Sequence, residues 1–175
     1  DDLDEVIKDI ERLLKESDDD VERVIREIKK LLDEVRKRVR DANEDSKRLL
    51  REVERLAEAG LDRERVEEEL RKIVEKSRKA VEEVKRLLDE ILKRVTDAVR
   101  EVHELNKDIL RRVRERVRDE RLVREIERRV RKSSEDLRRR LEEIRERVED
   151  IERELRKLHE EDKKRVEDIL TEVRR

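Results

Sequence analysis

The chain has 175 residues, of which 61% are charged and 33% hydrophobic, and its 52 basic and 54 acidic side chains nearly cancel. The absence of cysteine excludes disulfides, thiolate metal sites and cysteine nucleophiles. Apolar runs never exceed two residues, which excludes a membrane-spanning helix. A charge content this high is common in disordered chains, but strictly periodic apolar residues predict folded helices here.

In the first third of the chain, apolar residues recur every seven positions, which predicts one continuous helix over residues 2–58. The repeat consists of Ile7, Leu14, Val21, Ile28, Val35, Ala42, Leu49 and Leu56. It passes in phase through Ser17–Asp20, a stretch that otherwise resembles a loop. The flanking apolar positions drift along the segment, so its period is closer to 3.6 than to 3.5, and we expect a nearly straight helix.

The only glycine, Gly60, marks a tight turn after this helix. Glycine is favoured just past a helix C-terminus because that position needs a positive φ. Asp62 then fits the N-cap of the next helix, where its carboxylate can accept a backbone N–H. A connection this short predicts that the two neighbouring helices are antiparallel.

Two further helices are predicted, over residues 63–117 and 121–174. The apolar phase breaks by about two residues after Val117, which places a second turn at Arg118–Glu120 with Asp119 as its N-cap. Ser133 and Ser134 lie within the third segment without breaking its phase. We therefore expect an all-α fold, an antiparallel up-down-up bundle of three long, nearly straight helices that forms one domain over residues 1–175.

Uncharged polar residues occupy positions in the apolar stripes, and their numbering groups them into two layers. In the first two helices, which are antiparallel and joined near residue 60, two residues at the same level have numbers that add up to about 120. In the second and third helices, joined near residue 119, the numbers of two such residues add up to about 238. These totals place the following residues in a first layer: Ser17, His103, Asn106, Ser133 and Ser134. A second layer contains Asn43, Ser46, Ser77 and His159. Both layers draw on all three predicted helices.

Grouping has a physical reason, because a buried polar group without a partner costs about 1–3 kcal/mol. A grouped network also penalises a slip of one helix by a heptad, since its members would lose their partners. We therefore expect the layers to set the register of the helices.

The restricted residue set, the equal helices and the paired layers resemble those of de novo designed helical bundles with buried hydrogen-bond networks. Phe, Trp, Tyr, Met, Cys and Pro are all absent, and the core positions carry Leu, Ile, Val and Ala almost exclusively. The resemblance covers the whole chain but is one of style, and the second turn lacks the glycine that such designs often use. Natural spectrin-like repeats are the alternative, but they usually carry core aromatics. The resemblance implies a rigid, soluble scaffold that needs no cofactor.

No catalytic, cofactor or metal site is predicted. His103 and His159 fall in different layers, so they cannot share a metal ion, and no second histidine follows His103 at helical spacing. We expect both to be core histidines with hydrogen-bond partners, in a protein that is not an enzyme. A pH switch is a second interpretation, because burial disfavours the charged form of histidine and acid would then weaken the fold.

We expect the protein to be a monomer that binds neither nucleic acid nor membrane. The run Arg111–Arg140 has a net charge of +7, but the fold would place it beside residues 1–20, whose net charge is −7. The alternative is a protein–protein interaction module, either a subunit of a designed homo- or hetero-oligomer or a bundle with a displaceable third helix. The third helix carries 15 apolar residues against 20 in each of the others, which keeps this alternative open.

Overall fold

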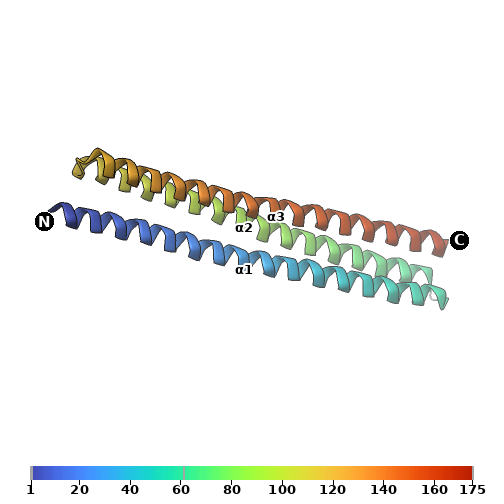
Figure 1. Ribbon diagram of the computed structural model, residues 1–175. Coiled ribbons are helices and arrows are strands. Elements are labelled where there is room, and N and C mark those ends of the chain that lie inside the picture. The colour runs from blue at the N-terminus through green and yellow to red at the C-terminus, as the bar shows by residue number, and fades with distance from the viewer. Residues whose placement is uncertain (1, 61, 175) are drawn as a thin grey trace. The chain divides into compact units, whose positions relative to one another are not determined.

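The structure is a computed structural model that describes residues 2–60 and 62–174, with the Asp2 side chain outside the description. It contains three α-helices: α1 (Asp2–Glu58), α2 (Arg63–Arg116) and α3 (Glu120–Arg174). The predicted all-α three-helix bundle is confirmed (Figure 1). Helix α1 runs unbroken through Ser17–Asp20, and α3 runs unbroken through Ser133 and Ser134, as the apolar phase predicted.

Gly60 has the positive φ expected of a glycine just past a helix C-terminus. Gly60 has a φ of 80°, and its backbone N–H donates to the carbonyl of Ala57 at 3.2 Å. Beyond Leu61, which lies outside the described residues, the Asp62 carbonyl accepts from the backbone N–H groups of Arg65 and Val66, both at 3.1 Å. The second helix therefore begins where the sequence predicted.

The second turn is built without glycine, and no described residue other than Gly60 has a positive φ. Asp119 Oδ1 accepts from the backbone N–H of Arg121 at 3.1 Å, so Asp119 caps α3 as predicted. Helix α2 ends at Arg116 and α3 begins at Glu120, each one residue earlier than predicted. Offsets of this size are usual at helix ends, where the last turn frays.

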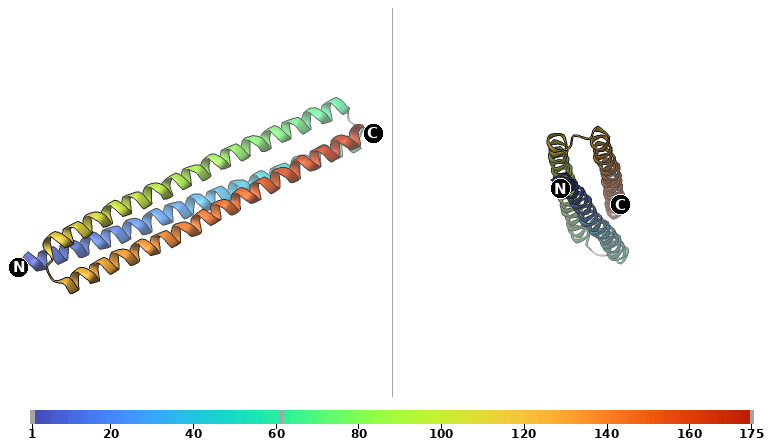
Figure 2. Two further views of the ribbon diagram at one scale, coloured as in Figure 1. Left: turned by 90° about the horizontal axis from the view of Figure 1, so that it is seen from above. Right: turned by 60° about the vertical axis from the view of Figure 1, so that its left-hand side comes forward.

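The fold divides into two compact units, each containing a segment of every helix. The described part of unit 1 comprises residues 2–31 and 91–146, and that of unit 2 comprises residues 32–60, 62–90 and 147–174. Within each unit, α2 runs opposite to α1 and α3 (Figures 1 and 2). The first polar layer falls entirely in unit 1 and the second entirely in unit 2.

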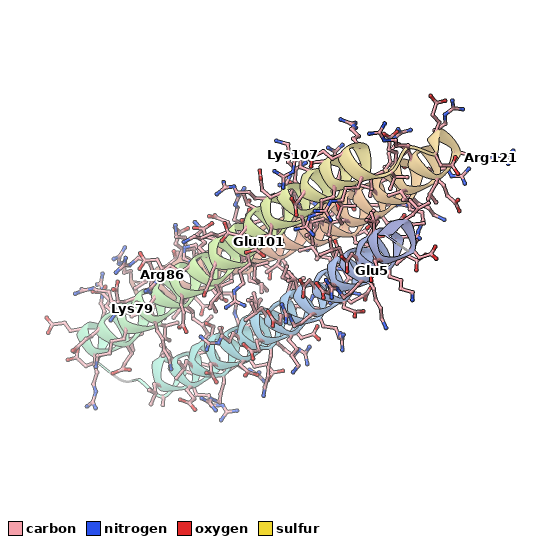
Figure 3. The ribbon with its side chains drawn as sticks, turned by 90° about the vertical axis from the view of Figure 1, so that its left-hand side faces the viewer. Glu5, Lys79, Arg86, Glu101, Lys107 and Arg121 are labelled. Atoms are coloured by element: carbon pink, nitrogen blue, oxygen red, sulfur yellow. The ribbon has the colours of Figure 1, made fainter. Side chains whose placement is uncertain are left out.

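Each unit has its own cluster of aliphatic core residues. The cluster in unit 1 is formed by Ile10, Leu14, Ile109, Val113, Val117, Ile126 and Val130. The cluster in unit 2 is formed by Leu50, Val53, Val66, Leu70, Ile73, Val166 and Ile169. Charged side chains cover the outer faces of the helices (Figure 3), as expected for helices whose apolar stripe faces a core.

Candidate functional site

In unit 1, the structure brings Asn106 on α2 and Ser134 on α3 together. The Asn106 Nδ2–H donates to Ser134 Oγ at 2.7 Å, and Asn106 is only 6% exposed. A buried amide without a partner would cost about 1–3 kcal/mol. Asn106 avoids this cost only when Ser134 lies at the same level along the helices.

The neighbouring serine, Ser133, contacts α1 instead of α2. Its hydroxyl donates to Asp18 Oδ1 on α1 at 3.1 Å, a contact that is exposed to solvent. Successive helical residues are about 100° apart around the axis, so Ser133 and Ser134 serve two different helix pairs. Together they tie α3 to both α1 and α2 within unit 1.

Two predicted members of this layer do not join it. Ser17 is 2% exposed, but its Oγ has no hydrogen-bond partner among the described residues. It lines a cavity of about 50 Å³ whose other walls are mainly aliphatic. His103 is exposed, contrary to the expected core position. The sum of residue numbers fixes a level along the helix but not a direction, and His103 follows buried Val102 by one residue, so it turns outward.

In unit 2, Ser77 on α2 and His159 on α3 lie within hydrogen-bond distance. Ser77 Oγ and His159 Nδ1 are 3.2 Å apart, and the contact is partly buried. Either the hydroxyl or the ring nitrogen donates, depending on the histidine tautomer. This pair links the same two helices as Asn106 and Ser134 do in unit 1.

A carboxylate completes the second layer. Burial raises the pKa of Asp162 on α3, and a hydrogen bond from the Ser46 hydroxyl on α1 opposes that shift. His159, one turn earlier on α3, also favours the charged carboxylate. The side-chain amide oxygen of Asn43 (Oδ1) is buried and has no hydrogen-bond partner among the described residues. Asn43 therefore lies at the level of the layer but does not bond to its other members.

One helix is common to these hydrogen bonds. The pairs Asn106–Ser134 and Ser77–His159 join α2 to α3, and the pair Ser133–Asp18 joins α1 to α3. Helix α3 has the fewest apolar residues of the three. Polar contacts therefore concentrate on the helix with the narrowest apolar stripe.

Asp18 and Asp162 were not among the residues predicted for the layers. Helices α1 and α3 run in the same direction, so residues at one level differ in number by about 118. Ser133 and Asp18 differ by 115, which meets this condition. The signal was present but weak, because acidic residues occupy 54 positions and many satisfy the same condition.

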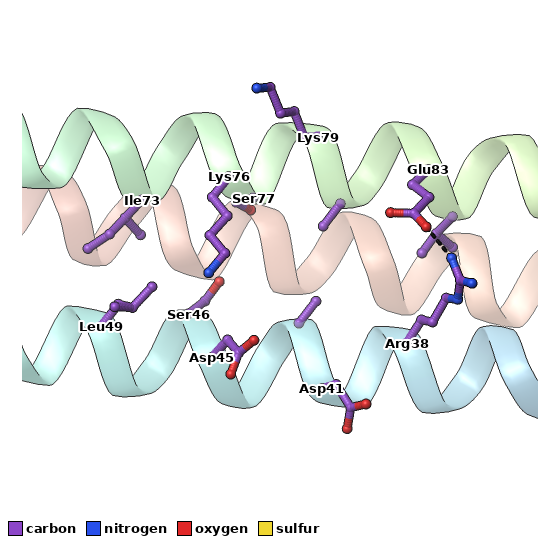
Figure 4. Close-up of a pocket in the computed structure, with 13 residues that line it drawn as sticks. Arg38, Asp41, Asp45, Ser46, Leu49, Ile73, Lys76, Ser77, Lys79 and Glu83 are labelled. Carbon is purple, nitrogen blue, oxygen red and sulfur yellow. Dashed lines mark hydrogen bonds and ion pairs between the residues drawn. The ribbon is translucent and has the colours of Figure 1, made fainter.

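The second layer opens into a groove of about 560 Å³ between α1 and α2 in unit 2 (Figure 4). Ser46 and Ser77 line it, and the small side chains of Ala42 and Ala80 leave the space. Arg38 and Glu83 form an ion pair across it. Because hydroxyl groups and charged side chains surround the space, water can reach the polar groups of this layer.

Ion pairs between helices occur at solvent-exposed positions in both units. In unit 1, Arg140 on α3 pairs with Glu22 on α1, and its guanidinium lowers the pKa of that carboxyl. In unit 2, Arg165 and Glu54 pair at 2.8 Å between the same helices. Exposed pairs contribute little, typically about 0–1 kcal/mol each. These ion pairs favour the helix arrangement in which opposite charges meet, whereas the aliphatic core supplies most of the stability.

Within the described residues, no group of three or more His, Cys, Asp or Glu side chains is arranged to hold a metal ion. None of the described helices combines the length and apolarity needed to cross a membrane.

Comparison with known proteins places the fold. A computationally designed three-helix bundle has a TM-score of 0.57 to this chain, with 18% sequence identity, and the match covers 98% of this chain and 90% of that one. In fold, the chain is similar to a designed three-helix bundle. No protein-family model and no curated protein matches the sequence. At this identity the likeness concerns the fold alone.

Proposed function

We propose that the chain is a designed structural scaffold, without enzymatic activity, that acts as one three-helix domain. Its two polar layers specify the register of α3 against α1 and α2. The observation that carries the proposal is the Asn106–Ser134 hydrogen bond of 2.7 Å, made by an amide that is 6% exposed. The Ser77–His159 contact repeats the same connection in the other unit.

The alternatives to this register are slipped arrangements of the same helices. Aliphatic heptads pack almost as well after a slip of seven residues, which moves a helix by about 10 Å. Such a slip would leave the Asn106 amide buried against aliphatic side chains, at a cost of about 1–3 kcal/mol. Polar pairs therefore separate registers that apolar packing alone distinguishes poorly.

Distances between spin labels on α2 and α3 test this role directly. Cysteine substitutions at Glu115 and Glu125, two exposed residues of unit 1, carry the labels. We expect one narrow distance peak in the parent. A variant that combines N106L, S134A, S77A and H159L should stay helical but show a second peak, because slipped registers become accessible.

Val113→Ala combined with Val130→Ala is the matched control, since it removes buried aliphatic groups from the same two helices and keeps both polar pairs. We expect this control to lose stability and to keep a single peak. A single unchanged peak in the variant without polar pairs would show that apolar packing sets the register, and the proposed role of the layers would be wrong.

A further inference from the structure

A second groove lies in unit 1, on the surface between α2 and α3. Its volume is about 380 Å³, and all of its lining residues belong to these two helices. On α2 it extends from Val99 to Arg114, and on α3 from Glu127 to Arg138. Sixteen residues of α-helix span about 24 Å, so the groove offers four helical turns of surface.

The floor of this groove is apolar and partly open to solvent. Val99 is 37% exposed, which makes it one of the three exposed large hydrophobic residues in the described chain, and Leu110, about three turns further along α2, is half-buried. The Asn106 amide, which also lines the groove, already donates to Ser134. An apolar partner could therefore cover Val99 and Leu110 without breaking that hydrogen bond.

The rim of the groove is basic on both sides. Lys107 and Arg114 line it from α2, Arg131 and Arg138 line it from α3, and two carboxylates, Glu127 and Glu135, oppose these four cations. Glu127 is already paired with Arg114 at 3.7 Å. Among the described residues, Lys107, Arg131 and Arg138 make no ion pair, and Lys107 projects away from the bundle (Figure 3).

Ion pairs also join the other two helix pairs of unit 1. An ion pair between Arg94 and Glu27 at 3.8 Å joins α2 to α1, and the pair of Arg140 with Glu22 joins α3 to α1. In unit 1, the basic segment Arg111–Arg140 lies beside an acidic part of α1, since residues 1–20 carry a net charge of −7. The groove also presents basic residues of α2 and α3, and no α1 residue lines it.

We propose that the α2–α3 groove of unit 1 binds an acidic amphipathic helix. The apolar seam of the partner would cover Val99 and Leu110, and its flanking Glu or Asp residues would pair with Lys107, Arg131 and Arg138. Charge complementarity of this kind selects partners and speeds association, and an amphipathic helix in an apolar groove is a common mode of recognition. This inference goes beyond the scaffold role and does not rest on the polar layers.

A nucleic acid fits the groove less well. Phosphates would satisfy the rim but would leave Val99 and Leu110 uncovered. The chain also has no aromatic side chain on which a base could stack.

Fluorescence anisotropy with a labelled three-heptad peptide tests the proposal. The probe carries Leu at positions a and d and Glu at e and g, and a second probe carries Lys at e and g. We expect saturable binding of the Glu probe and at least about tenfold weaker binding of the Lys probe. Arg131→Glu with Arg138→Glu should weaken binding of the Glu probe by at least about tenfold, and Val99→Asp should also weaken it.

Lys132→Glu with Arg139→Glu is the matched control, because it reverses two exposed charges on the same helix outside the groove. We expect this control to bind the Glu probe within about twofold of the parent. Binding that all groove variants leave unchanged would mean that the peptide exchanges with a bundle helix, and the groove proposal would be wrong. Absence of binding at about 100 µM, or tighter binding of duplex DNA than of the peptide, would also overturn it.

Discussion

The two polar layers each join α2 to α3, but with different degrees of burial. In unit 1, Asn106 is 6% exposed and donates to the half-buried Ser134, beside the α2–α3 groove that both residues line. In unit 2, both partners, Ser77 and His159, are half-buried, so neither is as enclosed as Asn106. Under the proposed role, a polar contact should restrict register most where water cannot replace the bond. Unit 1 should therefore respond more strongly than unit 2 to loss of a partner.

The largest effect should come from Ser134→Ala. It leaves the Asn106 amide buried without its partner, and we expect the free energy of unfolding to fall by about 1–3 kcal/mol. Ser77→Ala is the matched substitution in unit 2 and should cost less than about 1 kcal/mol, because water can bond His159. Urea unfolding of both variants measures the difference. Equal losses would contradict the contrast between the layers.

The two turns provide the next test. Gly60→Ala forces a β-carbon onto a residue with a φ of 80°, although a β-carbon there would meet no atom within 4 Å. We expect a loss of about 1–2 kcal/mol from backbone strain alone. Arg118→Ala, in the turn of unit 1 that has no positive φ, should change stability by less than about 0.5 kcal/mol. Thermal and urea unfolding would both report the difference, and a neutral Gly60→Ala would contradict it.

Ser17 should show a gain rather than a loss. Its hydroxyl is buried without a partner in unit 1, so Ser17→Ala should raise the free energy of unfolding by about 1 kcal/mol. Ser17→Val should also stabilise the protein, although valine is no better a helix former than serine. Ser17→Thr keeps the hydroxyl and should bring no gain. A destabilised Ser17→Ala would show that the hydroxyl is bonded in solution.

The smallest effect concerns pH and unit 2. Burial raises the pKa of Asp162 above its ordinary value of 3.8, so the folded state takes up this proton more readily than the unfolded state. The stability contributed by Asp162 is therefore present below pH 3.8 and is lost as pH rises through the folded pKa. Asp162→Asn should match or exceed the parent at pH 7 and lose that advantage as pH falls toward 4.

Urea unfolding at several pH values measures this difference. Asp168→Asn, which replaces an exposed carboxylate on the same helix, is the control. A variant that is less stable than the parent at pH 7, with a deficit that disappears in acid, would indicate a lowered pKa and would contradict the prediction.

Part of the candidate site could be predicted from the numbering of the chain. Helical rise is constant, so residue numbers fix levels, and this placed Asn106 near Ser134 and Ser77 near His159. Numbers do not fix the direction of a side chain around its helix. His103 therefore turned outward, and Ser133 bonded to Asp18 rather than to another uncharged residue. The sequence also could not predict which carboxylates meet the serine hydroxyls, because it contains 54 acidic residues.

The sequence by itself determined the three helices, both turns and the all-α fold. The reason is that apolar periodicity, helix caps and a single glycine act locally along the chain. Only the tertiary structure decided which polar groups find partners, because that depends on the rotation of each helix about its axis and on the side chains that a neighbouring helix presents. It also decided where small side chains leave open grooves, and one of these is the proposed docking surface between α2 and α3 in unit 1.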